Sequence, residues 1–396
     1  MAALDQLIRE LLETATRSDD AAELIELACA GLCELGVPLW RFSVGIQTID
    51  PTVRAVSYVW LRDRGLSRET TPYIPGPDND RPYLRSPIYA LVRDGLTFRH
   101  WRLEHDEGCA DVPLLAELRA AGATSYFLHI VRFSGEIAAA VPGVAIAMAT
   151  DRPGGFTEAD IASFVALLPA LGLASYRYML TRVSTAILGV YLGERTARRV
   201  LAGEVRRGTG RAIEAAILLA DLRGFTSLAG REPSARVVTW LDEHLDVIGA
   251  AVAGHEGEVL KFLGDGLLAV FVAEEAGGDR DACRRALAAA AQALAATADL
   301  NAQRREKGEP ELALDLVLHY GEVVYGNVGA ARRLDFTVIG PTVNEASRIE
   351  GLCEQLGRNL LLSAPFASRC GRPTTSLGLF ALRGCPGETE IRALAD

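Results

Sequence analysis

The sequence predicts a mixed α+β (α/β mixed) protein of two domains joined by a helical stalk. The chain has 396 residues, of which 49% are hydrophobic, so it is long enough to bury two or three cores. Segments with a period of two and segments with a period of three to four alternate in both halves of the chain. A helical pattern without strands separates these halves. We therefore expect domains at 1–171 and 208–396, with a helical, coiled-coil linker at 172–207.

The composition argues against several classes of function. A net charge of −10 argues against general binding to nucleic acids or anionic membranes, because both favour basic surfaces. The sequence has no apolar run of about 20 residues, so we expect no membrane-spanning helix. The amphipathic, acidic start "MAALDQLIRELLETA" is unlike a signal peptide. The seven cysteines are scattered and form no paired CxxC motifs, which argues against zinc and for the reducing cytoplasm.

The first domain reads as helix, strands, loop, strands and a closing helix. Residues 4–36 have helical periodicity, "LWRFSVGIQTID" alternates like a strand, and "ATSYFLHIVRF" and "GVAIAMAT" predict further strands. The last helix opens at "FTEADIASFVALL", where Thr157 and Asp160 are spaced for a capping box. This order and the "FTEAD" helix entry resemble a GAF domain. The resemblance implies a sensory module for an unknown small-molecule ligand.

Pocket residues of the first domain are harder to select from the sequence. Trp40, Arg41 and Tyr83 are conceivable ligand contacts, and core packing is the alternative for each.

The linker carries a short heptad seam, typical of a parallel two-stranded stalk. The alternative is a single amphipathic helix packed on its own domain. The apolar positions of the seam are Leu180, Val183, Ile187, Val190, Ala197 and Leu201.

From residue 212 onward, strands and helices interleave, which predicts an antiparallel or mixed sheet with helices on one face. The expected elements are a strand at 212–221, a helix at 232–254, two strands within 256–274, a helix at 279–304, strands near 312–328 and 334–340, a helix from 342 and short terminal strands.

Two aspartates stand where apolar strands of this domain run out. Asp221 ends "AAILLAD", and Asp265 lies between the glycines of "LKFLGDGLLAVF". Buried carboxylates are costly unless a positive charge meets them, and two converging carboxylates repel. Oxygen ligands suit Mg²⁺ or Mn²⁺, and the glycines allow close approach of backbone or phosphate. We expect the two aspartates to share metal ions.

Four motifs then show a family resemblance. "ILLADLRGFTSLA", "GEVLKFLGDGLLAVF", "LHYGEVVYGNVGA" and "RRLDFTVIGPTVNEASRIE" are similar, in order and spacing, to the motifs of class III nucleotidyl cyclases. The resemblance covers about 205–393. It implies a ferredoxin-like catalytic domain that works as a homodimer, with two equivalent sites at the subunit interface.

The same resemblance assigns the metal and phosphate positions. Asp221 and Asp265 would hold two divalent ions, Mg²⁺ or Mn²⁺, with help from the Leu222 backbone. Phe225 and Thr226, shortly after the first aspartate, would contact the substrate.

The resemblance also assigns the base-reading positions. Lys261 would read the adenine ring, and Thr337 occupies the other purine-selecting position. An ammonium donor suits the ring nitrogen of adenine, and a hydroxyl can accept from its exocyclic amine, whereas guanine reverses this edge. The pattern therefore favours ATP over GTP.

Four further residues complete the implied site. Asn344 and Arg348 are spaced four apart, which places them on one helical face. In the family the Asn orients the ribose and the Arg stabilises charge on the reacting phosphate. Arg332 and Arg383 align with triphosphate-binding basic positions. His255 and His319 match no catalytic position, so we expect structural roles for both.

The expected function is an adenylate cyclase that converts ATP to 3′,5′-cyclic AMP and pyrophosphate, regulated by the first domain. Two alternatives remain: a guanylate cyclase, and a non-catalytic nucleotide-binding regulatory protein. A diguanylate cyclase is disfavoured because its acidic glycine-rich hairpin signature is absent.

Overall fold

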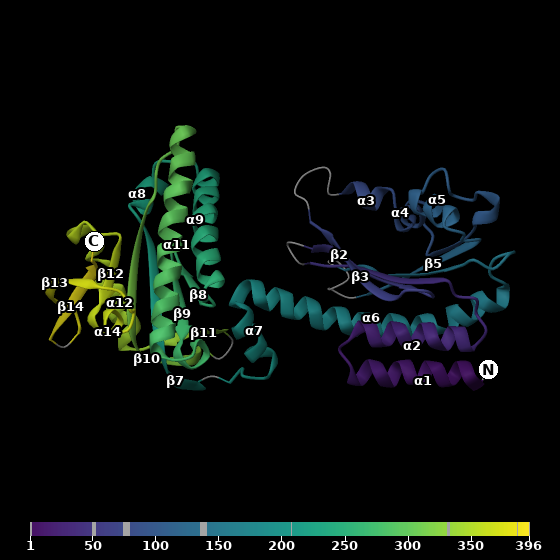
Figure 1. The fold of residues 1–396 in the computed structure, drawn as a ribbon, viewed down its shortest axis with the longest axis horizontal. Helices are drawn as coiled ribbons and strands as arrows, with labels where there is room; N and C mark the ends of the chain where they lie inside the picture. The colour runs from purple at the N-terminus through teal and green to yellow at the C-terminus, as the bar shows by residue number, and fades with distance from the viewer. Residues whose placement is uncertain are drawn as a thin grey trace. The chain divides into compact units, whose positions relative to one another are not determined.

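The chain folds into two compact units, residues 1–187 and 188–396, in a computed structural model (Figure 1). The structure describes residues 2–49, 53–73, 80–134, 141–206, 208–330, 333–385 and 387–395. Each unit contains its own sheet and its own buried core.

The first unit is built on a six-stranded antiparallel sheet with the strand order β3-β2-β1-β6-β5-β4. The strands are β1 (Arg41–Gln47), β2 (Val53–Leu61), β3 (Gly65–Pro72), β4 (Phe98–Arg102), β5 (Ser125–Arg132) and β6 (Gly143–Thr150). Alternate residues of β1 are buried, because one face of this strand packs on helices.

Helices cover both faces of this sheet (Figure 1). The described helices are α1 (Ala2–Arg17), α2 (Ala21–Glu34), α3 (Arg81–Leu84), α4 (Pro87–Arg93), α5 (Pro113–Ala120), α6 (Glu158–Leu192) and the short η2 (Leu103–His105). One apolar core joins α1, α2 and α6 to the sheet, and a second core joins α4 and α5 to the opposite face. The helical entry at "FTEAD" is confirmed as a capping box: Asp160 N donates to Thr157 Oγ1 at 3.2 Å, and Thr157 N donates to Asp160 Oδ2 at 2.7 Å.

The helix predicted over 4–36 is instead a pair of helices. The chain leaves α1 at Arg17 and begins α2 after Asp20, whose side chain accepts a hydrogen bond from Ala22 N at 2.9 Å. An aspartate that caps the backbone N–H groups favours a helix start over a helix interior. The periodicity continues through the break, which is why it concealed the turn.

Helix α6 carries the first part of the predicted stalk and then stops. It ends at Leu192, and Gly193, with φ +84°, separates it from α7 (Glu194–Leu201). The seam predicted from Leu180 to Leu201 is therefore not carried by one continuous helix. By length and composition, α6 is apolar enough to cross a membrane, although 44% of its most apolar window is buried in the protein. A core helix of a soluble protein has the same properties.

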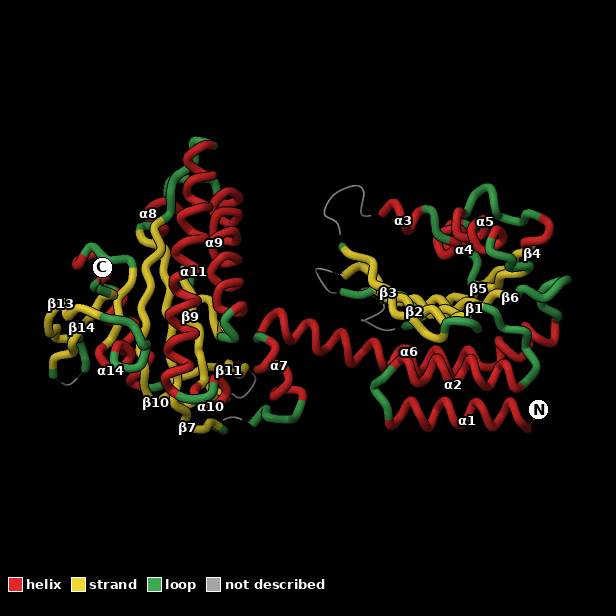
Figure 2. Tube along the Cα trace, viewed as in Figure 1, coloured by secondary structure: helices red, strands yellow, loops and turns green. Residues whose placement is uncertain are grey.

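The second unit contains an eight-stranded sheet in the order β13-β14-β12-β10-β7-β9-β8, with β11 paired to β10 (Figure 2). Its strands are β7 (Gly210–Arg223), β8 (Glu258–Leu263), β9 (Gly266–Val272), β10 (Ala313–Ala330), β11 (Arg333–Ile339), β12 (Leu360–Ser363), β13 (Thr374–Ala381) and β14 (Glu388–Leu394). The central order β10-β7-β9-β8 is that of a β-α-β-β-α-β, ferredoxin-like unit.

Two long helices cover one face of this sheet, and a shorter helix covers the other. The described helices of this unit, beyond α7, are α8 (Phe225–Ala229), α9 (Ser234–Gly254), α10 (Ala273–Ala276), α11 (Asp279–Glu306), α12 (Pro341–Glu350), α13 (Cys353–Leu356) and α14 (Ala364–Ala367). Small alanines of α11 pack closely on the sheet together with α9. Ala346 and Ile349 fix α12 to the opposite face.

A buried carboxylate fastens α7 to this sheet. Glu258, at the start of β8, accepts hydrogen bonds from Thr196 N and Thr196 Oγ1, both at 3.0 Å, and from Tyr325 Oη at 2.8 Å. Burial and the neighbouring Glu258 carboxylate raise the pKa of Tyr325 far above its usual value, so its hydroxyl stays a donor. Gly193 has a positive φ, and a Cβ there would lie 3.0 Å from Glu258 Oε1, so a side chain at this position would be strained and crowded.

Replacement of this carboxylate tests the fastening. We expect Glu258→Ala to lower the free energy of unfolding by about 2–4 kcal/mol, because it removes the acceptor of three buried hydrogen bonds, and the remaining contact between the Thr196 and Tyr325 hydroxyls can satisfy only one of these donors. The measurement is the midpoint of urea unfolding. Glu274, which is exposed and forms a surface ion pair with Arg211, is the matched control. Glu274→Ala should cost less than about 1 kcal/mol, and equal losses in the two variants would contradict the fastening.

Candidate active site

The two sequence-predicted metal aspartates lie side by side at one end of the sheet of the second unit. Asp221 is near the end of β7, and Asp265 lies in the tight turn between β8 and β9. The register pairs Ala220 with Leu267, so Asp221 comes opposite the turn. A Cβ at Gly266 would collide with the Ala220 carbonyl oxygen and lie 3.0 Å from Asp221 Oδ1. Only glycine permits this approach of β9 to β7.

The pair is electrostatically unfavourable without a cation. Burial, and then the charges of Asp265 and Asp315, raise the pKa of Asp221 to about 6. Neither Asp221 nor Asp265 forms an ion pair with any residue in the described part of the chain. Like charges that are partly removed from water disfavour ionisation, and a bound cation reverses this.

Two further carboxylates surround this pair, and the sequence reasoning missed both. Asp315 of β10 is the register partner of Asp221, and Glu350 ends α12. Burial and the charges of Asp221, Asp315 and Asp265 raise the pKa of Glu350. A polar residue inside the apolar stretch "ALDLVL" could have drawn attention to Asp315, but only the strand register brings it beside Asp221.

Asp315, unlike Asp221 and Asp265, has a cationic partner in the described part of the chain. Arg223 donates from Nε to Asp315 Oδ2 at 2.8 Å and from Nη2 to Oδ1 at 2.5 Å. This two-point contact is the strong geometry for an arginine–carboxylate pair. Asp315 therefore has a structural role in the sheet. Asp221 and Asp265, which have no cationic partner among the described residues, remain available to a ligand.

The donor set around Asp221 and Asp265 fits a hard divalent cation. Among the described residues, no group of three or more His, Cys, Asp or Glu side chains is placed to hold an ion. Mg²⁺ typically binds through one or two protein carboxylates, with water and substrate phosphates as the other ligands. The Leu222 side chain is buried in the core, so only its backbone carbonyl could take part, as the family resemblance implies.

The residues after Asp221 form the short helix α8. The Phe225 side chain is buried in the core, whereas Thr226 is exposed. Of the two predicted substrate contacts, Thr226 can therefore offer its side chain, and Phe225 can offer only its backbone.

Lys261 has a partner that the sequence reasoning did not name. Its ammonium group forms an ion pair with the Asp335 carboxylate, which joins β8 to β11. Both side chains are about half exposed. Thr337 stands two residues further along β11, opposite Gly326 of β10, and is largely buried. Because side chains alternate along a strand, Asp335 and Thr337 share a face.

Asn344 and Arg348 lie on one exposed side of α12. Ala346 and Ile349 bury the other side of this helix. The side chains of Asn344 and Arg348 form no hydrogen bond or ion pair with any described residue. They are free to contact a ligand.

The remaining predicted positions are placed less directly. Arg383 is exposed in the turn after β13, and β13 is separated from β7 by three strands of the sheet. Arg332 lies outside the described residues. His255 Nε2 contacts Gln292 Oε1 at 3.0 Å. His319 is buried with its Nε2 3.3 Å from Glu345 Oε2, and burial lowers its pKa to about 4.

Residues 210–361 of the second unit match the family model described as "Adenylate and Guanylate cyclase catalytic domain". Over these residues the second unit is therefore similar to the catalytic domains of adenylate and guanylate cyclases, as the four motifs indicated.

Curated relatives match part of the chain. The chain is 33% identical over 220 residues to "Adenylate cyclase 1" of Rhizobium meliloti (strain 1021), which covers 54% of this chain and 32% of the relative. It is 36% identical over 148 residues to "Adenylate cyclase" of Anabaena cylindrica, covering 37% of this chain and 29% of the relative. The chain thus spans about a third of the length of these relatives.

Solved structures are similar over about half of the chain. The adenylyl cyclase CyaB from P. aeruginosa has a TM-score of 0.44 at 23% identity, covering 48% of this chain and 96% of that one. The guanylyl cyclase Cya2 has a TM-score of 0.42 at 27% identity, covering 47% and 93%.

The repulsion at Asp221 predicts that removal of its charge stabilises the metal-free protein. Because the pKa of Asp221 is raised to about 6 in the folded state, the folded state binds more protons than the unfolded state between about pH 4 and pH 6. The free energy of unfolding therefore falls as the pH rises through this range. We expect Asp221→Asn to raise the free energy of unfolding of the metal-free protein at pH 8 by about 1–2 kcal/mol, after allowance for solvent screening, and so to raise its melting temperature. It should also abolish stabilisation by Mn²⁺.

Asp242→Asn, at an exposed position of α9, is the matched control and should change neither quantity. A loss of metal-free stability in Asp221→Asn, measured by calorimetry in EDTA, would refute the repulsion.

Proposed function

We propose that the chain is an adenylate cyclase that converts ATP to 3′,5′-cyclic AMP and pyrophosphate. The main support is the convergence of the uncompensated Asp221 and Asp265 at one edge of a cyclase catalytic domain. A domain that only bound nucleotide would have no need for a carboxylate pair that destabilises its fold.

The residues present suit a two-metal site. Asp221, Asp265 and the Leu222 carbonyl would hold two Mg²⁺ or Mn²⁺ ions, which when bound activate the ribose 3′-hydroxyl and neutralise the phosphates. Arg348, a permanently charged planar donor, would meet the charge that develops on the α-phosphate. Asn344, one turn earlier on α12, would hold the ribose. Arg332 and Arg383 would bind the triphosphate, and Thr226 would contact it from α8.

The base-reading residues favour ATP. Lys261 would donate to the adenine ring nitrogen, and Thr337 or Asp335 would accept from the exocyclic amine. Both curated relatives described above are named adenylate cyclases, which supports the same choice.

The Asp335 carboxylate also supports a second candidate substrate, GTP. A carboxylate can accept from both N1–H and N2–H of guanine while Lys261 donates to O6. The ion pair between Lys261 and Asp335 need not open for either base, because the ammonium group keeps further N–H donors and the carboxylate keeps further acceptor sites.

A homodimer would complete the site. In the proposed arrangement Asp221, Asp265 and Arg332 come from one subunit, and Lys261, Thr337, Asn344 and Arg348 from the other. Helix α6 offers a contact for such a dimer, since it exposes three apolar side chains at intervals of seven: Leu173 (58% exposed), Leu180 (41%) and Ile187 (42%). This spacing suits a parallel two-helix seam.

The first unit would regulate the cyclase in the cytoplasm by binding a small molecule. Its antiparallel sheet, with helices on both faces, is compatible with the proposed GAF-like sensory domain. A change at α6 could alter how the two catalytic domains meet, and so alter turnover.

Turnover of nucleotide is the direct test. Purified protein with Mn²⁺ or Mg²⁺ should form cyclic AMP from ATP faster than cyclic GMP from GTP, and Asp221→Ala and Asp265→Ala should each lower the rate at least about a hundredfold. Chromatography of the products measures both reactions. Asp242→Ala is the matched control. Faster cyclic GMP formation would favour the second candidate substrate, and no product with either nucleotide would leave a binding-only protein.

Complementation tests the shared site. Asp221→Ala and Arg348→Ala should each be inactive alone. When the two are co-expressed, half of the dimers are mixed and each has one intact site, so activity should return to about a quarter of the wild-type value. Cyclic AMP formed per dimer is the measurement. Persistent inactivity of a verified mixed dimer would place each site within a single chain.

A further inference from the structure

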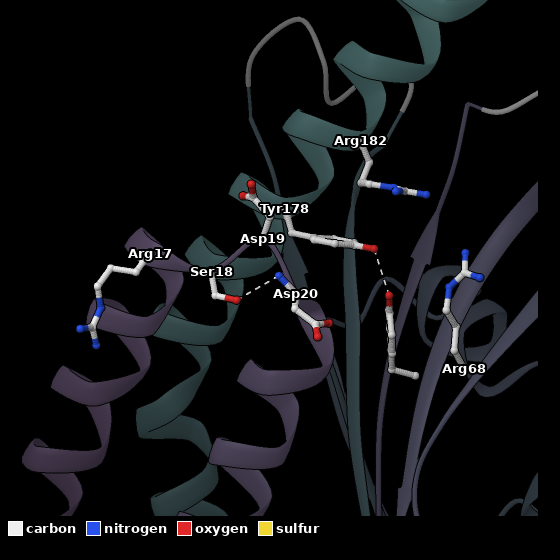
Figure 3. A pocket seen from close by; sticks show the side chains of 8 residues that line it. Arg17, Ser18, Asp19, Asp20, Arg68, Tyr178 and Arg182 are labelled. Carbon is white, nitrogen blue, oxygen red and sulfur yellow. Dashed lines mark hydrogen bonds between the residues drawn. The ribbon is translucent and has the colours of Figure 1, made fainter. Parts of the chain in front are cut away.

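The first unit contains an open hollow of about 670 Å³ between the α1–α2 turn, the β2–β3 hairpin and α6 (Figure 3). Its volume is within the range of about 300–1,000 Å³ that is usual for small-molecule sites. The lining residues are Arg17, Ser18, Asp19, Asp20, Tyr58, Arg68, Tyr178 and Arg182. None of the positions that the sequence suggested for a ligand pocket, Trp40, Arg41 or Tyr83, is among them.

Positive charge gathers at one side of this hollow. Figure 3 shows the guanidinium groups of Arg68 and Arg182 on the same side of the hollow as the hydroxyl of Tyr178. Both arginines are exposed, and neither forms an ion pair with a described residue. Guanidinium groups without a carboxylate partner are typical of sites for phosphate or carboxylate groups, which they bind through two parallel hydrogen bonds.

Two tyrosine hydroxyls extend this donor set. Tyr58 Oη and Tyr178 Oη are 3.0 Å apart, so one donates to the other and the second proton is left for a ligand. Burial, and then the hydrogen bond with Tyr58, raise the pKa of Tyr178 to about 12, while Arg182 and Arg68 act in the opposite direction. The phenol stays protonated at neutral pH. Arg68 and Arg182 line the same hollow as this hydroxyl pair.

The acidic side of the hollow is largely compensated. Arg177 donates to Asp19 Oδ1 and to the Ser18 carbonyl oxygen, both at 2.7 Å, and so ties the α1–α2 turn to α6. Asp20 accepts from Ala22 N and caps α2. These contacts hold the turn in place and reduce the repulsion that an incoming anion would meet. The remaining carboxylate oxygens can accept from a hydroxyl or amino group of the same ligand.

We propose that this hollow binds a small molecule that carries a multivalent oxyanion group, with Arg68, Arg182 and Tyr178 as the anion contacts. The group is a phosphate or a cluster of carboxylates, and the ligand also carries hydroxyl or amino groups that face Asp20. The site lies within the first unit, apart from the nucleotide site, so its test needs no cyclase turnover.

Calorimetric titration of the full-length protein tests the proposal. The probes are inorganic phosphate, pyrophosphate and citrate, each in EDTA so that no metal bridges an anion to the catalytic aspartates. We expect at least one probe to bind at one site per chain. Phosphate or pyrophosphate binding identifies a phosphate source, and citrate binding identifies a carboxylate source. Binding of none of the three overturns the proposal.

Variants locate the site. Arg68→Gln and Arg182→Gln should each weaken binding roughly tenfold or more, and Tyr178→Phe should weaken it severalfold. Arg64→Gln is the matched control, because Arg64 is an exposed arginine of the same β2–β3 hairpin and does not line the hollow. Equal weakening in the control, or unchanged binding in both Arg68→Gln and Arg182→Gln, also overturns the proposal. Circular dichroism of each variant verifies folding, which neither exposed arginine should affect.

Discussion

The mutual repulsion of Asp221 and Asp265 is the constraint on which the second unit depends. Two half-buried carboxylates are held together by strand pairing, and the missing side chain at Gly266 lets β9 approach β7 closely enough. Their proximity costs stability in the absence of a cation. The broad apolar contact of α9 and α11 with the sheet stabilises the second unit and offsets this repulsion. A site of this kind therefore belongs on a rigid sheet and not on a loop.

The same corner of the sheet shows how structural and functional carboxylates differ. Asp315 is more deeply buried than Asp221, yet the two-point contact with Arg223 compensates its charge. Asp221 and Asp265 have no such partner. Depth of burial alone would have pointed to Asp315 as the unusual residue. The absence of a compensating charge among the described residues identifies the pair that awaits a ligand.

The sequence predicted the second unit well because its elements are strongly periodic and its motifs are local. It predicted the convergence of Asp221 and Asp265 from the ends of strands. It could not reveal Asp315 or Glu350, because their proximity depends on the register of β7 with β10 and on the packing of α12. The Lys261–Asp335 ion pair was missed for a similar reason, since it joins strands far apart in the chain. In the first unit, the apolar periodicity of residues 4–36 continues across the turn before Asp20, so it did not reveal that α1 ends and α2 begins there.

The attachment of α7 to the sheet of the second unit is polar, and this affects what it can transmit. Apolar packing tolerates small rotations, because dispersion contacts have little directionality, whereas hydrogen bonds weaken steeply when misaligned. Glu258 accepts three hydrogen bonds and begins β8, the strand that carries Lys261. A rotation of α7 would thus strain the strand that carries Lys261. Helix α6, which is separated from α7 by a single residue, also carries Tyr178 and Arg182 of the hollow in the first unit. A ligand that fixes those two side chains would act on the helix that precedes α7 in the chain.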